Sequence, residues 1–517
     1  MSSRTMPHRD SNADHTSRPP HVVWLMCDQL RADALGFAGN AHVRTPNLDR
    51  LAARGVVFDQ MYPQSSVCVP SRACMITGRY MRPLGMSGGA SMLNPRETTL
   101  PEVLQQRGYR TSLFGKLHLT PQQYTLSDLG SDCPVNDARP FVEPAGIPPA
   151  PERPEKQHYG FQDRVEIEDT LRGQYVDWLM QRDPALAQRV PRDRASAMNE
   201  APWRQLYPDS PLRDVGPVDM PAELHPSMFV GESAADYFAQ HHAETPLFMQ
   251  VSFVDPHHPF DPPEEIARDY PAERMPSPKY TDTGAVTWPA GLAERVPDFS
   301  DVTDEMARTT VGLYYAMVEM IDRGVGRLLE AIERAGEMDN TVFVFVADHG
   351  EMLGDYGLWR KGSYHYDCLI RVPCFVSWPA KLPQGQRIDE LTQAIDLMPT
   401  LLGLLGVDAP PGVQGRDLST RLVQGESVGR PFIYCELFTA WWGPFVACWT
   451  VRTAEAKLNY FPDDRVGHLF DLRDDPDERV DRYDDPASRA LRDQMMTHLL
   501  TSMHEQTDPL PRVLSQF

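Results

Sequence analysis

Polar residues that could bind a metal ion or an anion follow four separate apolar runs of this 517-residue chain. They are Asp28 with Gln29, Lys116 with His118, His257 with His258, and Asp348 with His349. Each group alone has an ordinary structural explanation, because an aspartate after a strand is often a turn former or a helix cap, and a lone histidine is often a satisfied structural group. Four such groups at the ends of apolar runs indicate one site, built where the runs meet.

These residues divide into metal ligands and cationic groups. The first set supplies two carboxylates, an amide oxygen and an imidazole, and consists of Asp28, Gln29, Asp348 and His349. Its oxygens suit Ca²⁺ or another divalent ion, and the histidine leaves room for Mn²⁺. The second set is cationic or can become so, and consists of Arg72, Lys116, His118, His257 and Lys361. A divalent ion beside several cations matches the charge of a tetrahedral oxyanion ester, so we expect hydrolysis of a sulfate or phosphate-type ester.

A cysteine-containing stretch, "SSVCVPSRACMITGRY" from Ser65 to Tyr80, stands apart from these groups. An isolated cysteine such as Cys68 is most often a small buried hydrophobe. The chain has eight cysteines, which are scattered and form no zinc-type CxxC pair. We therefore expect reduced thiols in a cytoplasmic protein, and disulfide pairing is not the leading explanation of Cys68.

Five apolar runs predict the sheet that must position these side chains. The runs are "HVVWLMCD", "YRTSLFGK", "PLFMQVSFVDPH", "TVFVFVADHG" and "RVPCFVSWP". Continuous apolar runs that alternate with helical patterns indicate strands buried on both faces of a largely parallel sheet. Residues 303–336 place apolar side chains at helical spacing on one face. The predicted fold class is therefore α/β, with a large, mostly parallel, mixed sheet between helices.

The chain divides into a tail, a large catalytic domain and a small C-terminal subdomain. Residues 1–20 are polar and end in two prolines, which predicts a disordered tail without a secretory signal or membrane span. The α/β domain is expected over residues 21–425, with a loop-rich insertion of short helices at 129–220 that influences substrate choice. Short strand patterns followed by a helical pattern predict an antiparallel α+β subdomain over residues 426–517.

The formal net charge of −22 restricts the partners. Nucleic acids and membrane surfaces are anionic and would be repelled over most of the protein surface. An anionic substrate must therefore meet a local basic pocket, and the expected partner is a small anionic ester.

The segment around Cys68 resembles the signature of the type I, formylglycine-dependent sulfatases of the alkaline phosphatase superfamily. That signature is C-x-P-S-R followed by a hydrophobic-Thr-Gly-Arg segment, and here it reads Cys68, Val69, Pro70, Ser71, Arg72, then Ile76, Thr77, Gly78 and Arg79. The similarity also runs through "DQLRADALGFAGN", "TPNLDRLAARGVVFDQMY", "GKLHL", "VDPHHPFDPP", "DHGEMLGDYGLWRKGS", "IDLMPTLLGLLG" and "LFDLRDDPDERVDRYDDP". It covers most of the chain from His21, apart from residues 129–220.

This resemblance implies a nucleophile that the gene does not encode directly. A maturase would read the C-x-P-S-R segment on the nascent chain and oxidise Cys68 to formylglycine, which hydrates to a geminal diol. One diol oxygen, bound to the metal, would attack sulfur, and loss of the proton from the second hydroxyl would expel sulfate. The metal would be held by Asp28, Gln29, Asp348 and His349 together with the modified Cys68.

The resemblance also implies roles for the cationic residues. Arg72 and Lys116 would hold the diol and its surroundings, and His118 would accept the proton from the second hydroxyl. His257 would protonate or steady the leaving oxygen, and Lys361 would contact both the sulfate and the leaving group. His258 is the weaker choice of the two adjacent histidines, because the H-x-P pattern of the family starts at His257.

The metal-ligand pairs depart from those of many family members, which carry Asp-Asp and Asp-Asn. The pair Asp28-Gln29 lacks one carboxylate and Asp348-His349 adds an imidazole, so Ca²⁺ is the expected ion and Mn²⁺ the alternative. Similar pairs occur in relatives that hydrolyse phosphonate monoesters and phosphodiesters, and this activity is the alternative function. A silent sulfoester-binding protein that keeps Cys68 as a thiol and an interaction scaffold are further alternatives.

The sequence leaves the alcohol part of the substrate open. Trp441 and Trp442 could stack on an aryl or sugar group, or face the cation of an ester such as choline sulfate, but burial between the two domains is the favoured role. The oligomeric state is also open, with a homo-oligomer among the alternatives.

Overall fold

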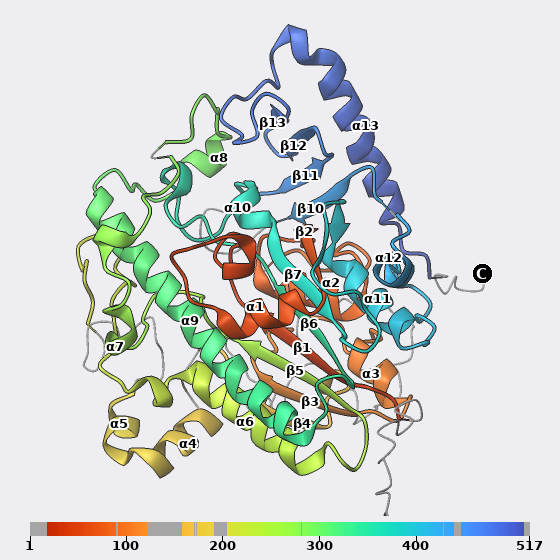
Figure 1. The fold of residues 1–517 in the computed structure, drawn as a ribbon. Coiled ribbons are helices and arrows are strands. Elements are labelled where there is room, and N and C mark those ends of the chain that lie inside the picture. The colour runs from red at the N-terminus through yellow and green to blue at the C-terminus, as the bar shows by residue number, and fades with distance from the viewer. Residues whose placement is uncertain are drawn as a thin grey trace, which may run out of the picture.

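The computed structural model describes residues 18–88, 91–120, 158–169, 171, 173–190, 204–280, 282–427, 429–438 and 446–510. Its centre is a nine-stranded sheet with the order β4-β3-β5-β1-β6-β7-β2-β8, in which β9 also pairs with β2 (Figure 1). The strands are β1 (His21–Cys27), β2 (Val56–Tyr62), β3 (Arg110–Gly115), β4 (Asp163–Glu166), β5 (Leu247–Phe253), β6 (Thr341–Ala347), β7 (Val372–Ser377), β8 (Gln386–Ile388) and β9 (Thr392–Gln393). The five apolar runs form β1, β3, β5, β6 and β7, whereas the sequence analysis did not predict the other four strands.

The direction of the strands makes the sheet mixed. Strands β4, β3, β5, β1 and β6 run parallel to one another. Strand β7 is antiparallel to its neighbours β6 and β2. Strands β1, β5 and β6 are buried along their whole length, as strands covered on both faces should be. The predicted α/β class with a mostly parallel, mixed sheet is confirmed.

The longest helix matches the helical spacing in the sequence. It is α9 (Asp304–Ala335), within the predicted range 303–336. The Thr303 hydroxyl oxygen accepts the Met306 N–H at 3.2 Å, and Gly336 ends the helix with a φ of 73°. The remaining helices of the main part are α1 (Pro46–Ala53), α2 (Cys68–Thr77), α3 (Leu100–Gln105), α4 (Gln174–Arg182), α5 (Pro184–Arg189), α6 (Pro226–His241), α7 (Glu264–Ala267), α8 (Ala290–Ala293), α10 (Asp367–Ile370), α11 (Leu397–Leu404) and α12 (Ser419–Gln424).

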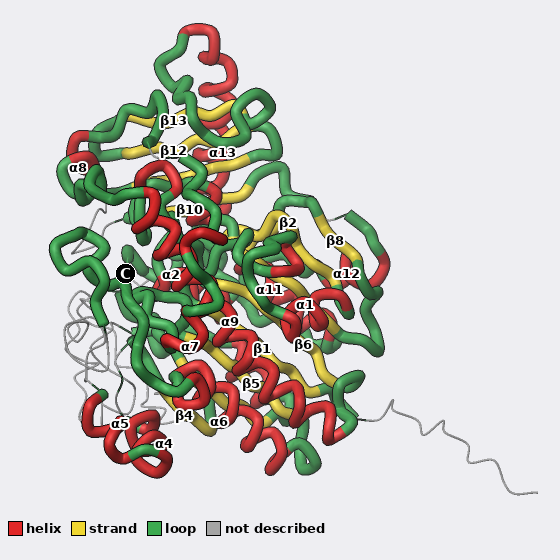
Figure 2. Tube along the Cα trace, turned by 60° about the vertical axis from the view of Figure 1, so that its left-hand side comes forward, coloured by secondary structure: helices red, strands yellow, loops and turns green. Residues whose placement is uncertain are grey.

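Helices cover both faces of the sheet, as strand β5 illustrates. Helices α6 and α9 run side by side (Figures 1 and 2), and a Cβ on Gly231 of α6 would lie only 2.2 Å from the Gly324 carbonyl oxygen of α9. The Phe253 side chain lies against Gly324. Gln250, which points to the opposite face of β5, lines a cavity with Met75 of α2 and Leu100 of α3. Helix α2, which begins at Cys68, therefore packs on the face opposite to α9.

A second, antiparallel sheet follows the main one in the chain. Its order is β10 (Ile433–Leu437), β11 (Cys448–Arg452), β12 (Ala456–Phe461) and β13 (Val466–Asp471), and α13 (Arg489–Glu505) packs on β11 and β12 (Figure 1). The Glu436 N–H donates to the Gln64 carbonyl oxygen at 2.8 Å, which ties β10 to the segment after β2. The predicted small antiparallel sheet is confirmed, and the boundary between residues 425 and 426 stays a prediction.

The predicted insertion at 129–220 is described only in part. Its described residues contain the short helices α4 and α5, as expected, and also β4, which extends the sheet beside β3. Residues 1–17, Cys133, Trp441 and Trp442 lie outside the described residues. None of the helices in the described ranges combines the length and the apolar character that a membrane span requires.

Candidate active site

The four predicted polar groups lie together at the carboxyl ends of β1, β3, β5 and β6. Hydrogen bonds of the sheet continue one step past the strands, because the Asp28 N–H donates to the Phe253 carbonyl oxygen at 3.2 Å. Likewise, the Lys116 N–H donates to the Ser252 carbonyl oxygen at 2.9 Å. Gly115 makes this approach possible, since its φ is 96° and a Cβ there would lie 1.9 Å from the Ser252 oxygen.

Four buried side chains form a cluster that fits a metal ion. Ligand atoms of Asp28, Cys68, Asp348 and His349 all lie within 4.8 Å of one another. Asp28 Oδ1 is buried and has no hydrogen-bond partner among the described residues, although buried polar atoms normally have one. His349 Nδ1 lies 2.8 Å from the Gly350 carbonyl oxygen, so Nδ1 carries the proton and Nε2 keeps a lone pair 3.7 Å from Asp28 Oδ1. The donor set is therefore ready for a divalent cation.

Gln29, the remaining predicted ligand, lies beside this cluster. Its φ is 64°, and its backbone N–H donates to Asp348 Oδ1 at 3.0 Å. Its Nε2 donates to Glu351 and lies 3.2 Å from His258 Nδ1. Its Oε1 is buried and unpartnered within the described part of the chain, so this oxygen is available as a ligand.

Arg72 holds the two carboxylates of the cluster from inside the core. Its Nε donates to Asp348 Oδ2 at 2.6 Å, and its Nη2 lies 3.3 Å from Asp28 Oδ2. Its Nη1 donates to the Lys116 carbonyl oxygen and to the Ser252 hydroxyl oxygen. Burial by itself raises the pKa of Asp28, but Lys116 and other cations lower it more, and the pKa lies well below its usual range. The neighbouring cations therefore outweigh burial and keep Asp28 ionised.

Cys68 begins α2 and faces Lys361. The Lys361 Nζ lies 3.1 Å from Cys68 Sγ, 3.1 Å from His257 Nε2 and 3.2 Å from His349 Nε2. Burial raises the pKa of the Cys68 thiol to about 11, and Asp28 adds to the rise, although Lys361 opposes it. The unmodified thiol is therefore protonated near neutral pH. Lys361 connects the candidate nucleophile, the metal cluster and His257.

The two adjacent histidines have different contacts. Their rings stack with centroids 4.1 Å apart. His257 Nδ1 lies 2.6 Å from the His258 carbonyl oxygen, so this nitrogen carries a proton and Nε2 accepts from Lys361. Burial, reinforced by Lys361, holds the pKa of His257 well below its usual range. His257 is thus the histidine of the pair that reaches Lys361.

Lys116 and His118 lie at the β3 end of the site. Lys116 Nζ is 2.8 Å from Asp28 Oδ2 and also pairs with Asp169. Both ring nitrogens of His118 are buried, and neither has a hydrogen-bond partner in the ranges that the structure describes. Burial, with Lys116 adding to it, holds the pKa of His118 well below its usual range. The imidazole is therefore neutral and free to accept a proton.

Comparison with known proteins identifies the family of this site. Residues 20–407 match the sulfatase family model, and residues 354–506 match the model for the C-terminal part of N-sulphoglucosamine sulphohydrolase. The chain belongs to the sulfatase family. It is a sulfuric ester hydrolase of the alkaline phosphatase superfamily, as the resemblance in the sequence implied.

Named relatives cover nearly the whole sulfatase chain. An arylsulfatase of Clostridium perfringens is 27% identical over 468 residues, which are 89% of either chain. An N-acetylglucosamine-6-O-sulfatase of Bacteroides thetaiotaomicron is 24% identical over 492 residues, or 89% of this chain and 82% of that one. The solved structure of a phosphonate monoester hydrolase of Agrobacterium radiobacter is 25% identical, with a TM-score of 0.75 over 95% of this chain and 96% of that one.

The sulfatase site contains three carboxylates that the sequence analysis missed. Glu168 Oε1 accepts the backbone N–H groups of Leu117 at 3.0 Å and His118 at 3.1 Å. Asp169, the next residue, pairs with Lys116. Both residues follow β4, and polar residues just after a strand are the ones expected to form the site. They would have been predicted if "DRVEIED" had been recognised as a strand and the residues after it. The third is Glu351, which lies one residue beyond the "DHG" of the predicted metal pair.

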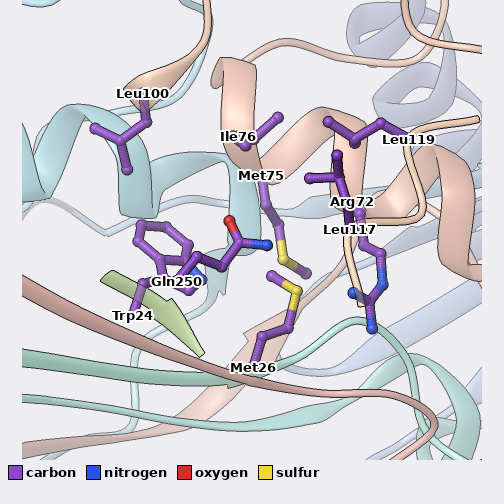
Figure 3. Close-up of a pocket in the computed structure, with 9 residues that line it drawn as sticks. All are labelled: Trp24, Met26, Arg72, Met75, Ile76, Leu100, Leu117, Leu119 and Gln250. Carbon is purple, nitrogen blue, oxygen red and sulfur yellow. The ribbon is translucent and has the colours of Figure 1, made fainter. Parts of the chain in front are cut away.

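A separate cavity lies beside the sulfatase site, between α2, α3 and β1. Figure 3 shows the Trp24 and Met26 side chains across from Met75 and Ile76, with the Arg72 guanidinium at one side. Apart from Arg72 and Gln250, the side chains that line it are apolar, and they include no predicted metal ligand or nucleophile. We therefore attribute this cavity to the packing of α2 on the sheet.

Proposed function

We propose that this sulfatase cleaves the sulfate monoester of an aryl, sugar or alkyl alcohol through formylglycine made from Cys68. The observation that carries the proposal is the position of Cys68, which begins α2 inside the metal-ligand cluster and contacts Lys361. A thiol whose pKa burial raises to about 11 is a poor nucleophile near neutral pH. The hydrated aldehyde supplies two hydroxyl groups in its place, and one of them attacks sulfur.

Asp28, Gln29, Asp348 and His349, with the modified Cys68, would hold one divalent cation. The fit is supported by the unpartnered oxygens Asp28 Oδ1 and Gln29 Oε1 and by the lone pair of His349 Nε2. When bound, the cation lowers the pKa of a hydroxyl group and offsets charge on the sulfate oxygens. Ca²⁺ is the ion that the oxygen ligands favour, and Mn²⁺ is the alternative that the imidazole favours.

Lys361 and His257 would act on the sulfate and on the leaving oxygen. One ammonium group, Lys361 Nζ, lies 3.1 Å from both Cys68 Sγ and His257 Nε2. It can therefore contact a sulfate held at Cys68 and also donate to the histidine that serves the leaving oxygen. The Nδ1 proton of His257 is committed to the His258 carbonyl oxygen, and Nε2 accepts from Lys361. Nε2 would therefore take a proton from Lys361 Nζ and pass it to the leaving oxygen, or steady that oxygen once protonated.

His118 would take the proton from the second hydroxyl group. A base must be neutral before it accepts a proton, and burial together with Lys116 keeps His118 neutral. Loss of that proton re-forms the carbonyl group while the bond between carbon and the sulfate oxygen breaks. Lys116, held by Asp28 and Asp169, and Arg72, held by Asp28 and Asp348, would fix the surroundings of this transfer.

The proposed partners are a small anionic sulfate ester and, during synthesis, a maturase that reads residues 68–72. The net charge of −22 makes nucleic acid and membrane surfaces poor partners. A cytoplasmic location, a homo-oligomer and the division into residues 21–425 and 426–517 stay predictions.

A phosphonate monoester or phosphodiester hydrolase with the same chemistry is the second candidate. It is favoured by the similarity to the solved phosphonate monoester hydrolase and by the ligands Gln29 and His349. The deciding experiment measures kcat/KM for 4-nitrophenyl sulfate, a 4-nitrophenyl phosphonate monoester and a 4-nitrophenyl phosphodiester with one preparation of the enzyme. Our proposal predicts the highest kcat/KM for the sulfate ester. A higher kcat/KM for either phosphorus ester would instead support the phosphonate monoester or phosphodiester hydrolase.

A further inference from the structure

Glu351 is a buried carboxylate surrounded by strained backbone. Its relative exposure is 0%, and three of the residues that it contacts have positive φ values. These are Gln29 at 64°, Leu353 at 50° and Arg360 at 64°. Non-glycine residues adopt such values rarely, and they persist only where the surrounding contacts enforce them. One side chain thus contacts three such residues next to the proposed metal ligands and next to Lys361.

The two oxygens of Glu351 have different partners. Oε1 accepts the backbone N–H groups of Leu353 at 2.9 Å and of Arg360 at 2.5 Å. Oε2 accepts from the Nε2 of Gln29. Gln29 follows the proposed metal ligand Asp28, and Arg360 precedes Lys361. This carboxylate therefore connects the segment that carries the proposed metal ligands to the segment that carries Lys361.

These contacts fix the orientation of the Gln29 amide. The oxygen and nitrogen of an amide are told apart by their hydrogen-bond partners. Here Nε2 faces two acceptors, Glu351 Oε2 and His258 Nδ1, and Oε1 is left buried and unpartnered in the described ranges. A carboxylate at position 351 therefore holds the NH₂ group and leaves the amide oxygen, rather than the NH₂ group, without a partner among the described residues.

We propose that Glu351 is a positioning residue, which directs the Gln29 oxygen at the metal and holds the backbone beside Lys361. The inference rests on the proposed metal site. It also explains why a neutral glutamine can serve as a ligand here. The amide can present its oxygen to the metal only if its NH₂ group has an acceptor on the other side, and Glu351 is that acceptor.

The consequence of replacing Glu351 follows from its partners. In E351Q the new amide oxygen has to stay with the N–H groups of Leu353 and Arg360, which turns its NH₂ group toward Gln29. Two NH₂ groups would then face each other, so Gln29 would flip and present nitrogen protons to the metal. The variant should still fold, because Arg31 Nη1 holds the Glu351 and Met352 carbonyl oxygens independently, at 3.2 and 3.0 Å.

The test is Mn²⁺ affinity, measured by isothermal titration calorimetry on the purified full chain, with Ca²⁺ titrated in parallel. We expect E351Q and Q29A each to bind Mn²⁺ about 10- to 100-fold more weakly than the wild type, as loss of a supporting contact typically does. In the Q29A background, E351Q should cost at most about twofold more, because the amide that it orients is already gone. Independent, multiplying losses would overturn the proposal.

An exchange of the two side chains supplies the rescue. In Q29E/E351Q the amide at position 351 can donate to one oxygen of the carboxylate introduced at position 29, and the second oxygen of that carboxylate faces the metal. His258, with its proton moved to Nδ1, can donate to the same carboxylate. We expect this variant to bind Mn²⁺ at least about tenfold more tightly than Q29E, in which two carboxylates face each other. No gain over Q29E would overturn the proposal, and this pair is informative even if E351Q alone does not fold.

The outcomes separate this inference from the metal site itself. Wild-type protein that binds neither ion would overturn the proposed site and the inference with it. Wild-type binding together with an unchanged affinity of E351Q would overturn the role of Glu351 alone.

Discussion

Replacing Lys361 by methionine removes one ammonium group and keeps most of the side-chain volume. That group touches Cys68 Sγ and His257 Nε2, both at 3.1 Å, and His349 Nε2 at 3.2 Å. It lies in a site where the relative exposure of the lysine is 4%, so water cannot take its place easily. In our account this charge stabilises the sulfate and the oxygen on which negative charge develops as the ester bond breaks.

The size of the loss follows from that burial. Removing one preorganised donor to a developing oxyanion typically costs about 100- to 1,000-fold in rate, or about 3–4 kcal/mol. We expect K361M to lower kcat by that amount. We also expect a larger loss for esters of poorly acidic alkyl alcohols than for 4-nitrophenyl sulfate, because a poor leaving group depends more on the stabilisation of its oxygen.

Initial rates on a series of aryl and alkyl sulfates give kcat and KM for the wild type, K361M and a control. The matched control is K279M, which removes a lysine that is half exposed and pairs with Asp477; it should leave kcat within about twofold. A loss below about tenfold for K361M, or a loss that is the same for every leaving group, would refute the role that we give to Lys361.

Three further results are expected. H118A should release about one equivalent of alcohol in a fast phase and then turn over slowly, because the step that expels sulfate lacks its base; stopped-flow traces without a burst would contradict this. Chelation of the bound metal should lower the unfolding temperature, and restoring Mn²⁺ or Ca²⁺ at 100 times its Kd should return about 2.7 kcal/mol; scanning fluorimetry that shows no shift with either ion would count against the site. Burial raises the pKa of Glu168 from the ordinary value of 4.5 to about 7 in the folded protein. The folded state therefore gains stability from the protonated side chain below about pH 4.5, and this gain is lost as the pH rises through about 7. The unfolding temperature of E168Q, which is permanently neutral, should therefore exceed that of the wild type by a margin that grows from about pH 5 to about pH 8, and a constant margin would contradict the shift.

The strand-end residues show what the sequence could predict. Apolar runs buried on both faces are continuous, so β1, β3, β5 and β6 were recognisable together with the polar residues that follow them. Asp28 and Asp348 meet because parallel neighbours in one sheet end at the same edge. The signature around Cys68 added the predicted nucleophile, which could not be found from strand ends because Cys68 lies on α2.

Other features depend on contacts that periodicity does not report. Strand β7 is buried along its whole length like the parallel strands β1, β5 and β6, so its antiparallel direction could not be read from its residues. Strand β4 lies at the sheet edge, and three of its four residues are charged. It therefore lacks the apolar run that marks the other strands, and Glu168 and Asp169 beyond it were missed for that reason. Glu351 was adjacent to a predicted ligand, but only the fold reveals that its oxygens face Gln29 and Arg360.

Every proposed chemical step depends on the conversion of Cys68 to formylglycine, which mass spectrometry of the peptide that contains residue 68 can detect. The protein should be made in a host that has the maturase, beside a sulfatase known to be converted in that host and beside C68S as a matched control. We predict that the wild-type peptide shows the mass deficit of an aldehyde in place of the CH₂–SH group. A peptide found only as the thiol or its alkylated form, while the companion sulfatase is converted, would contradict the account.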